Sequence, residues 1–353
     1  MDKRSTGIVY HDDFLLHTNY SHPECKVRLE AIMKRLKEKE VLKFLAQIVP
    51  RQGAPLETIA LVHGEPYIKG VEKACNDGRQ QLDADTYLTS HTYGVARLAV
   101  QGGLDAVAAV MNGKLNKVFA LLRPPGHHAE ANQGMGFCIF NNIAIAARVL
   151  QREYGLERIM IVDWDVHHGN GTQHVFEEED GVLFFSVHQS PAYPGTGGLG
   201  EVGRKKGTGY TLNAPLPPGC GDGDYLMLFQ EIVLPVMHAF APQILLVSAG
   251  QDAYQGDPLA SMNLSKECYA HIAALLCQGA EASAGGKMIF FLEGGYNIDA
   301  QADIVFNILN TTGEWGLPLI EDGQTDNRLV AEGTINNIKN RYKQYWNILQ
   351  ERS

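Results

Sequence analysis

Four short segments of the sequence are crowded with side chains that can bind a metal ion or transfer a proton. The segment DWDVHHGNG (163–171) alone places two acids and two histidines within six residues. The other three segments are RPPGHHAE (123–130), SAGQDA (248–253) and LEGGYN (292–297). An apolar core is destabilised by such groups, whereas a metal ion needs them as ligands. The four segments therefore indicate a metal-dependent reaction rather than a structural role.

The segment DWDVHHGNG has the spacing of a metal site. Asp163, Asp165 and His167 are two residues apart, so on an extended backbone they point to one side. We expect Asp165 and His167 to bind a divalent metal, with Asp252 as a third ligand. Two carboxylates and one neutral imidazole make a nearly neutral, open zinc site that lowers the pKa of a bound water to roughly 7. The competing interpretation, that the aspartates cap a turn, fits a buried strand end less well.

Paired histidines and a tyrosine supply groups for proton transfer. His127 and His128 follow a rigid Pro-Pro-Gly, so both imidazoles can approach one reacting centre. One of them could take a proton from the metal-bound water and return it to a leaving amine. Asp163 and Asn170 are the candidates to fix their tautomers. The Tyr296 hydroxyl could stabilise an oxyanion, although in isolation such a tyrosine is more often a packing residue.

Aromatic residues beside flexible loops suggest a narrow binding channel. Phe137 in MGFC and Tyr193 in AYPG could form walls around a thin aliphatic chain, although each in isolation is more often a core residue. Cys138 is expected to be a buried thiol rather than a ligand or a nucleophile. Three further histidines are expected to be structural or to support the ligands: His168, His174 and His188.

Apolar runs of strand length precede all four polar segments, at 117–122, 158–162, 243–248 and 287–292, and a fifth run covers 182–187. The runs are continuous rather than alternating, as in strands buried on both faces. Helical patterns cover 26–45, 141–156, 225–240 and 268–282. Alternating strands and helices predict an α/β fold, with a mostly parallel central sheet flanked by helices. The active site is then expected at the carboxyl ends of the strands.

Composition narrows the class of protein. The 353 residues are 45% hydrophobic, enough for a large core, and we expect one domain over 1–353 with 311–353 as a C-terminal appendage ending in a helix. A net charge of −10 argues against nucleic-acid binding. The glycine- and proline-rich stretch 190–210 is expected to be a long functional loop.

The cysteines and the distribution of apolar residues indicate where in the cell the protein is located. None of the six cysteines forms a C-x-x-C pair, which is typical of reduced thiols in an intracellular protein. The N-terminus lacks the apolar core of a signal peptide. The sequence has no run of about 18 apolar residues, so we expect no membrane span. We therefore expect a cytoplasmic protein with no membrane partner, and an oligomer is possible.

Taken in order, the motifs resemble those of a known family. RPPGHHAE, GFCIFNN, IVDWDVHHGNGTQ, PGTG, SAGQDA and LEGGYN are similar to the zinc-dependent histone deacetylase family within the arginase/deacetylase superfold, over roughly residues 7–310. Three of them, RPPGHHAE, GNGTQ and LEGGYN, resemble the class II branch, which includes bacterial amidohydrolases and acetylpolyamine amidohydrolases.

The resemblance implies a role for each matching residue. It makes Asp165, His167 and Asp252 the zinc ligands and His128 the general base and acid, with His127 as its electrostatic neighbour. Asp163 would support His127, Asn170 would support His128, and Tyr296 would polarise the substrate carbonyl. The implied substrate contacts are the walls Phe137 and Tyr193, the backbone of Gly136, Leu259 near the mouth and, on a weaker match, Asp85 at the rim. The implied potassium ligands are Asp163, Asp165, His167, Ser186 and Val187, partly through main-chain carbonyls.

Two positions depart from the family pattern. Tyr193 stands where the family usually has Phe, and its hydroxyl could narrow or polarise the tunnel. Gln251 stands before Asp252 where class II relatives often have Phe, which could alter local packing or hydrogen bonding. Neither departure removes a catalytic group.

Four functions remain to be compared. A zinc deacylase acting on acyl-lysine-like amides is favoured by Leu259, because polyamine-selective relatives often have a glutamate at that position. An acetylpolyamine amidohydrolase is weakly favoured by the negative net charge. Binuclear arginase-like hydrolysis would need a second carboxylate where Ala253 and Tyr254 follow Asp252. An idle protein that only binds acylated ligands should have lost a catalytic residue, and none is lost.

Overall fold

A single parallel sheet of eight strands forms the centre of the protein. The structure is a computed structural model that describes residues 6–322 and 328–350. The strand order is β2-β1-β3-β8-β7-β4-β5-β6, and every neighbouring pair is parallel. The strands are β1 (Thr6–Val9), β2 (Ala46–Ile48), β3 (Lys117–Ala120), β4 (Ile159–Asp163), β5 (Val182–Gln189), β6 (Thr211–Leu216), β7 (Ile244–Ala249) and β8 (Met288–Leu292).

The predicted strands are found, and the α/β fold is confirmed. All five apolar runs form strands, and every residue of β3, β4, β7 and β8 is buried. Their continuous apolar sequence fits strands that are covered by helices on both faces. The prediction missed β1, β2 and β6, which are short or, in β6, contain a proline.

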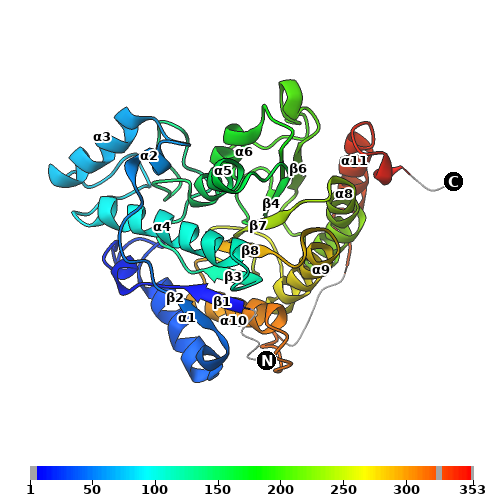
Figure 1. Cartoon of the computed structure of the whole chain (residues 1–353). Coiled ribbons are helices and arrows are strands. Elements are labelled where there is room, and N and C mark those ends of the chain that lie inside the picture. The colour runs from blue at the N-terminus through cyan, green and yellow to red at the C-terminus, as the bar shows by residue number, and fades with distance from the viewer. Residues whose placement is uncertain (1–5, 323–327, 351–353) are drawn as a thin grey trace.

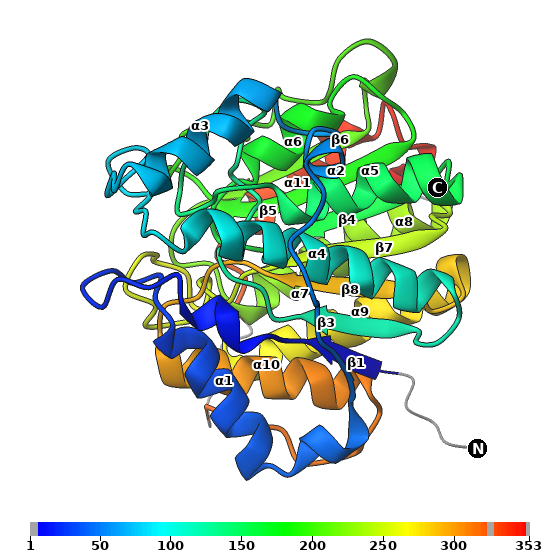
Figure 2. The same cartoon turned by 60° about the vertical axis from the view of Figure 1, so that its left-hand side comes forward.

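Helices cover both faces of the sheet, as Figures 1 and 2 show. α4 and α5 lie on one face, and α1, α10, α9 and α8 lie on the other. The helices are α1 (Val27–Glu38), α2 (Leu56–Ile59), α3 (Glu65–Asn76), α4 (Thr92–Met111), α5 (Asn142–Tyr154), α6 (Asn170–Phe176), α7 (Asp222–Leu228), α8 (Leu234–Phe240), α9 (Lys266–Ala284), α10 (Ile298–Thr312) and α11 (Glu332–Tyr342).

Two predicted helices are shorter than their sequence patterns. α1 ends at Glu38, because Glu40 adopts a left-handed conformation with φ of 54°, and a short 3₁₀ turn follows at Val41–Phe44. The segment 225–240 is divided into α7, a π turn at Phe229–Val233 and α8. Pro235, at the start of α8, has no N–H to donate, so the α-helical hydrogen-bond pattern is disturbed just before it.

The C-terminal segment packs along the edge strand β6. Ile335, Ile338 and Tyr342 of α11 are buried. The Tyr342 hydroxyl accepts a hydrogen bond from the Asn213 N–H (2.5 Å) and donates one to the Asn213 carbonyl (3.1 Å). This helix therefore covers an edge that would otherwise expose unpaired backbone groups. The one-domain organisation stays a prediction.

One helix resembles a membrane span by length and composition. Among the described residues, α4 is long and apolar enough to cross a membrane, but 56% of its most apolar stretch is buried inside the protein. α4 packs on α5 and β3. Its apolar composition is therefore accounted for by its place in the core.

Candidate active site

The four polar segments meet at the carboxyl edge of the sheet. They follow β3, β8, β7 and β4, which are consecutive neighbours in the strand order. Parallel strands end at the same edge, so residues far apart in the chain come together there. A cavity of about 240 Å³ opens at this point. It is lined by Asp85, Pro125, His127, His128, Gly136, Phe137, Asp165, His167, Tyr193, Leu259, Gly294 and Tyr296.

Asp165, His167 and Asp252 form a compact group of possible metal ligands. Their ligand atoms lie within 4.8 Å of one another, and His167 Nδ1 lies 3.2 Å from Asp165 Oδ1 and 3.2 Å from Asp252 Oδ2. Backbone donors hold the carboxylates: Asp165 Oδ2 accepts from Gly294 N (2.8 Å), and Asp252 Oδ1 accepts from Val166 N (2.9 Å). Each of the two carboxylates is thus held by a backbone N–H from the loop that follows another strand.

The group fits a cation on three observations. Apart from its contact with His167, the buried Oδ2 of Asp252 has no hydrogen-bonding partner among the described residues. A Cβ at Gly294 would lie 2.1 Å from Asp252 Oδ2 and 2.7 Å from Asp165 Oδ2, so both carboxylates converge over this glycine. Burial alone would lower the pKa of His167, but the two carboxylates raise it to about 10. Such concentrated negative charge is what a divalent ion would neutralise.

The rings of His127 and His128 lie side by side but in opposite electrostatic surroundings. His127 Nδ1 pairs with Asp163 Oδ2 at 2.9 Å, and His128 Nδ1 pairs with Asn170 Oδ1 at 2.8 Å. Burial would lower the pKa of His127, yet Asp163 and Asp165 raise it well above its usual value. Burial and the neighbouring His127 lower the pKa of His128. The pKa values of the two imidazoles are thus pushed in opposite directions, a separation that is typical of groups with different acid–base roles.

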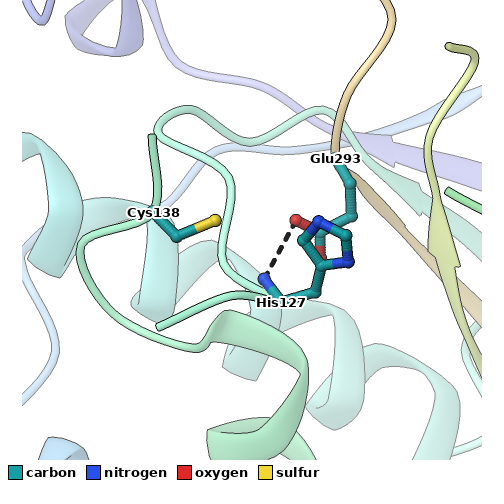
Figure 3. Close-up of side chains that lie close together, drawn as sticks. All are labelled: His127, Cys138 and Glu293. Carbon is teal, nitrogen blue, oxygen red and sulfur yellow. Dashed lines mark hydrogen bonds between the residues drawn. The ribbon is translucent and has the colours of Figure 1, made fainter. Parts of the chain in front are cut away.

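Glu293 anchors the loop that carries these histidines. Its Oε2 accepts from the N–H groups of Gly126 (2.7 Å) and His127 (3.2 Å), and Ser248 Oγ donates to its Oε1 (3.2 Å). Figure 3 shows the Glu293 carboxylate next to the backbone nitrogen of His127, with the Cys138 thiol on the other side of the carboxylate. The three side chains of His127, Cys138 and Glu293 also have possible ligand atoms within 4.8 Å. However, burial raises the pKa of the Cys138 thiol, so that it stays protonated, and Glu293 is already engaged by the backbone.

Tyr296 presents a neutral hydroxyl to the cavity. Burial raises its pKa well above the usual value, so the hydroxyl remains a donor. The Arg28 guanidinium stacks on the Tyr296 ring at 5.0 Å and donates to the carbonyls of Gly295 (2.8 Å) and Glu293 (2.5 Å). Asp257 Oδ2 accepts from the Tyr296 N–H at 2.7 Å. The backbone on either side of Tyr296 is thus held by the side chains of Arg28 and Asp257.

Aromatic residues enclose the way into the cavity. Gly136 and Phe137 both adopt left-handed backbone conformations, with φ of 55° and 69°. The Tyr193 ring is perpendicular to that of His128, with centroids 5.1 Å apart. Tyr193 and Leu259 are 38% and 41% exposed, so they stand at the mouth. Asp85 lines the same cavity, and burial and its neighbour Asp83 raise its pKa.

Of the residues predicted to bind potassium, Asp165 and His167 line the cavity, whereas Asp163, Ser186 and Val187 are fully buried away from it. Asp163 and Ser186 are register partners on adjacent strands, and Val187 is buried next to Ser186. Ser186 Oγ contacts His188 Nδ1 at 2.9 Å, and His168 bridges Thr196 and Gln173. Burial lowers the pKa of both His168 and His188. These two histidines are therefore neutral polar supports.

Several residues around the site were not singled out in the sequence. Arg28, Asp257 and Glu293 hold the tyrosine and histidine loops, and Glu130 contacts Asn170. Three of them lie in short motifs that could have indicated them: Asp257 in GDP, Glu293 in LEGGYN and Glu130 in GHHAE. Arg28 lies in an amphipathic helix, whose pattern gives no such indication. Gln251 is directed toward Gln301 of α10, whose Nε2 donates to its Oε1 at 3.0 Å.

The chain is similar to known proteins over most of its length. The sequence matches the histone deacetylase domain over residues 22–312. It is 38% identical to a probable deacetylase of Archaeoglobus fulgidus, over 97% of this chain and 98% of that protein. It is 36% identical to the human polyamine deacetylase HDAC10, over 87% of this chain and 48% of that longer protein. The crystal structure of the HDA15 HD domain superposes with a TM-score of 0.89 at 34% identity, covering 98% of this chain and 96% of that one.

Proposed function

We propose that this chain, which belongs to the histone deacetylase family, is a zinc-dependent deacylase that hydrolyses the amide bond of acyl-lysine-like substrates. The observation that carries the proposal is the meeting of three groups in one cavity. These are the Asp165, His167 and Asp252 ligand group, a histidine pair with opposite pKa shifts, and the neutral Tyr296 hydroxyl. An idle binding protein would have no need to keep all three.

The metal would be held by Asp165, His167 and Asp252. Two carboxylates and one imidazole match the donor set of an open catalytic zinc site. A divalent ion bound there would polarise the acyl carbonyl and lower the pKa of a water molecule. We also propose a potassium ion near Asp163 and Ser186, because these two buried polar residues are register partners on adjacent strands and Asp163 contacts His127.

His128 is the residue that we assign to proton transfer. Its lowered pKa leaves the imidazole neutral, so Nε2 can accept a proton from the attacking water and then give it to the leaving amine nitrogen. His127, held cationic by Asp163, would stabilise negative charge that develops nearby. The opposite pKa shifts of the two rings support this division of roles.

Tyr296 is the residue that we assign to the carbonyl oxygen. Its hydroxyl would donate a hydrogen bond as negative charge develops there, and it needs no reorganisation because Arg28 and Asp257 fix its loop. Phe137 and Tyr193 would contact the aliphatic stem of the substrate on either side. The backbone of Gly136 would meet the substrate amide, and Asp85 would bind the substrate backbone at the rim.

Two substrate classes compete for this cavity. Leu259 at the mouth offers apolar surface rather than a charge, which favours an acyl-lysine side chain. The similarity to a polyamine deacetylase and the carboxylate of Asp85 favour an acylated polyamine as the alternative. We rank the acyl-lysine class first, because an apolar mouth residue cannot pair with a polyamine ammonium group. We also propose a reducing, cytoplasmic location, since all six cysteines are free.

The test is kcat/KM on an acetyl-lysine peptide and on an N-acetylated polyamine, measured side by side. Zinc-loaded protein should prefer the peptide, and chelation should abolish turnover. His128→Ala and Tyr296→Phe should each lower kcat by about 100-fold or more while zinc stays bound. Turnover that resists chelation would refute the metal-dependent mechanism. A strong polyamine preference would refute the acyl-lysine assignment and leave the hydrolytic one intact.

A further inference from the structure

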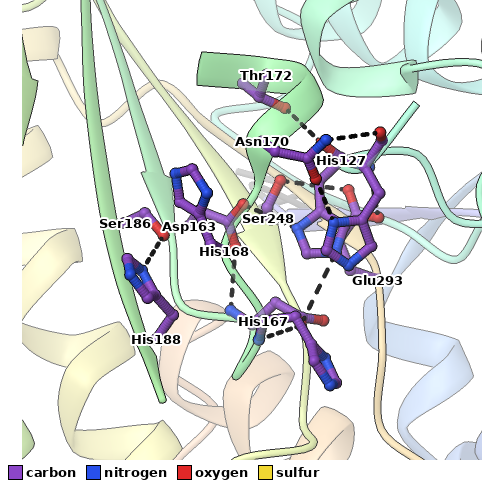
Figure 4. Close-up of polar contacts among 12 residues, drawn as sticks. His127, Asp163, His167, His168, Asn170, Thr172, Ser186, His188, Ser248 and Glu293 are labelled. Atoms are coloured by element: carbon purple, nitrogen blue, oxygen red, sulfur yellow. Dashed lines mark hydrogen bonds and ion pairs between the residues drawn. The ribbon is translucent and has the colours of Figure 1, made fainter. Parts of the chain in front are cut away.

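We infer that Glu130 is a positioning residue that fixes the tautomer of His128 by orienting the side-chain amide of Asn170. The inference rests on the proposed role of His128 as the base, and it extends the catalytic apparatus to a residue outside the cavity. Asn170 Oδ1 lies 2.8 Å from His128 Nδ1, while Asn170 Nδ2 donates to Glu130 Oε1 at 2.5 Å. Figure 4 shows Asn170 in the polar network next to His127.

The chemistry of the three groups allows only one arrangement. An ionised carboxylate can accept hydrogen bonds but cannot donate them, so the amide nitrogen of Asn170 must face Glu130. The amide oxygen then faces His128, and the Nδ1 atom of that ring must carry the hydrogen. Nε2, on the other side of the imidazole, is left with the free lone pair that a general base requires. The other acceptors of Asn170 Nδ2, the His128 carbonyl at 3.3 Å and Met135 Sδ at 3.6 Å, are more distant, so without Glu130 the amide is held less firmly and the wrong tautomer gains population.

Glu130 is itself firmly placed. His174, one helical turn after Asn170 on α6, contacts the same Oε1 atom at 2.8 Å. The backbone carbonyl of Glu130 contacts His63 Nδ1 at 2.9 Å, and the backbone N–H of Glu130 donates to the Gln133 carbonyl at 2.9 Å. Partial burial would raise the pKa of Glu130, but His174 and Asn170 lower it, which keeps the carboxylate ionised. The carboxylate is therefore fixed in position and in charge.

A structural role alone predicts different behaviour from a positioning role. The Glu130 side chain is 24% exposed and that of His174 is 40% exposed, so their pairing is partly screened by water and contributes little to folding. If Glu130 acts only on stability, its removal should leave kcat unchanged at temperatures where the protein is folded. If it acts through Asn170, its removal should lower kcat and spare both KM and zinc binding.

The experiment compares Glu130→Ala, Glu130→Gln and the control Glu178→Ala in zinc-loaded protein. Glu178 is a half-exposed residue that pairs only with Lys205 among the described residues and lies outside the network. We expect Glu130→Ala to lower kcat on the acetyl-lysine peptide by about 10- to 100-fold, with KM within about twofold. Glu130→Gln keeps an acceptor oxygen for Asn170 and should recover most of the rate. The control should match the unmodified protein.

A double-mutant cycle with Asn170→Ala separates the mechanism from independent effects. If Glu130 acts through Asn170, the double variant should be no slower than Asn170→Ala alone. Losses that multiply would overturn the inference, as would unchanged kcat in Glu130→Ala. Absence of turnover in the unmodified protein would instead refute the proposed function.

A second readout does not depend on activity. In long-range ¹H–¹⁵N spectra, His128 should be in the Nδ1–H form in the unmodified protein, with its signals assigned by their loss in His128→Gln. The Glu130→Ala variant should show a mixture of tautomers. An unchanged Nδ1–H form in that variant would overturn the inference even if no substrate were turned over.

Discussion

Gly136→Ala should block the cavity without disturbing the metal ligands. A Cβ at this position would lie 2.4 Å from His128 Cδ2 and 2.9 Å from Tyr193 Cε1. Ordinary contacts begin near 3.4 Å, so the methyl group would push the imidazole by about 1 Å. That displacement is enough to break the 2.8 Å contact between His128 and Asn170.

The expected loss can be worked out from two separate terms. Gly136 has a φ of 55°, and an alanine forced into this left-handed conformation costs about 1–2 kcal/mol of stability. The steric term acts on catalysis, because a misplacement of about 1 Å in a reacting group costs on the order of 100-fold in rate. We therefore expect kcat/KM to fall by about 100-fold, with zinc content unchanged.

Gly195→Ala is the matched control. Gly195 has a φ of 87° and lies two residues from Tyr193, but a Cβ there would meet nothing within 4 Å. It should show the same kind of conformational cost, seen as a lower melting temperature, and nearly normal kcat/KM. The assay is steady-state hydrolysis of an acetyl-lysine peptide, with unfolding followed in parallel. If both variants lose activity equally, backbone strain rather than obstruction explains the loss, and the reasoning is refuted.

Three further predictions concern the metal, pH and the C-terminal helix. Asp165→Ala should deplete zinc in elemental analysis, and stoichiometric zinc in that variant would contradict the ligand assignment. Burial lowers the pKa of His63 to about 4. The unfolded chain therefore binds a proton at His63 below about pH 6.5, whereas the folded state does not. As a result, the free energy of unfolding should fall by about 2 kcal/mol between pH 7.5 and pH 5 because of this group. His63→Gln lacks that loss, so its stability deficit in urea unfolding should shrink by about 2 kcal/mol over this range, and a constant deficit would be contrary to the prediction. Tyr342→Phe leaves the buried N–H of Asn213 without its partner, which should cost about 1–3 kcal/mol of stability at unchanged kcat, whereas unchanged stability would show that this hydrogen bond is dispensable.

The sequence predicted those parts of the fold that depend on local pattern. The central strands are continuous apolar runs, such as ILLVSA in β7, and the polar segments that follow them can be assigned to one edge. The strand ends then bring Asp165, His167 and Asp252 together, and the histidines to Asp163 and Asn170. Local pattern was sufficient because each of these residues lies at the end of a strand or a few residues beyond it.

Contacts that depend on distant segments could not be predicted in this way. Arg28 lies in α1 and reaches the Tyr296 loop across 267 residues of sequence, and nothing in its helical pattern indicates that contact. Glu130 meets Asn170 only because the loops after β3 and β4 converge. The strands β1, β2 and β6 lack a long apolar run, so tertiary packing rather than local propensity defines them.

The position of β8 has a consequence for the order in which the protein can be assembled. β8 is the last strand in the chain, yet it lies between β3 and β7 in the middle of the sheet. Until it is synthesised and inserted, the three strands on one side have no hydrogen-bonded connection to the four on the other. The ligand group belongs to the later half and the histidine pair to the earlier one, and the Tyr296 loop follows β8 itself. A ribosome-bound chain could therefore gather the metal ligands first, but it acquires its proton-transfer groups and its hydroxyl donor in one late, non-local step, a kind of step that makes folding slow.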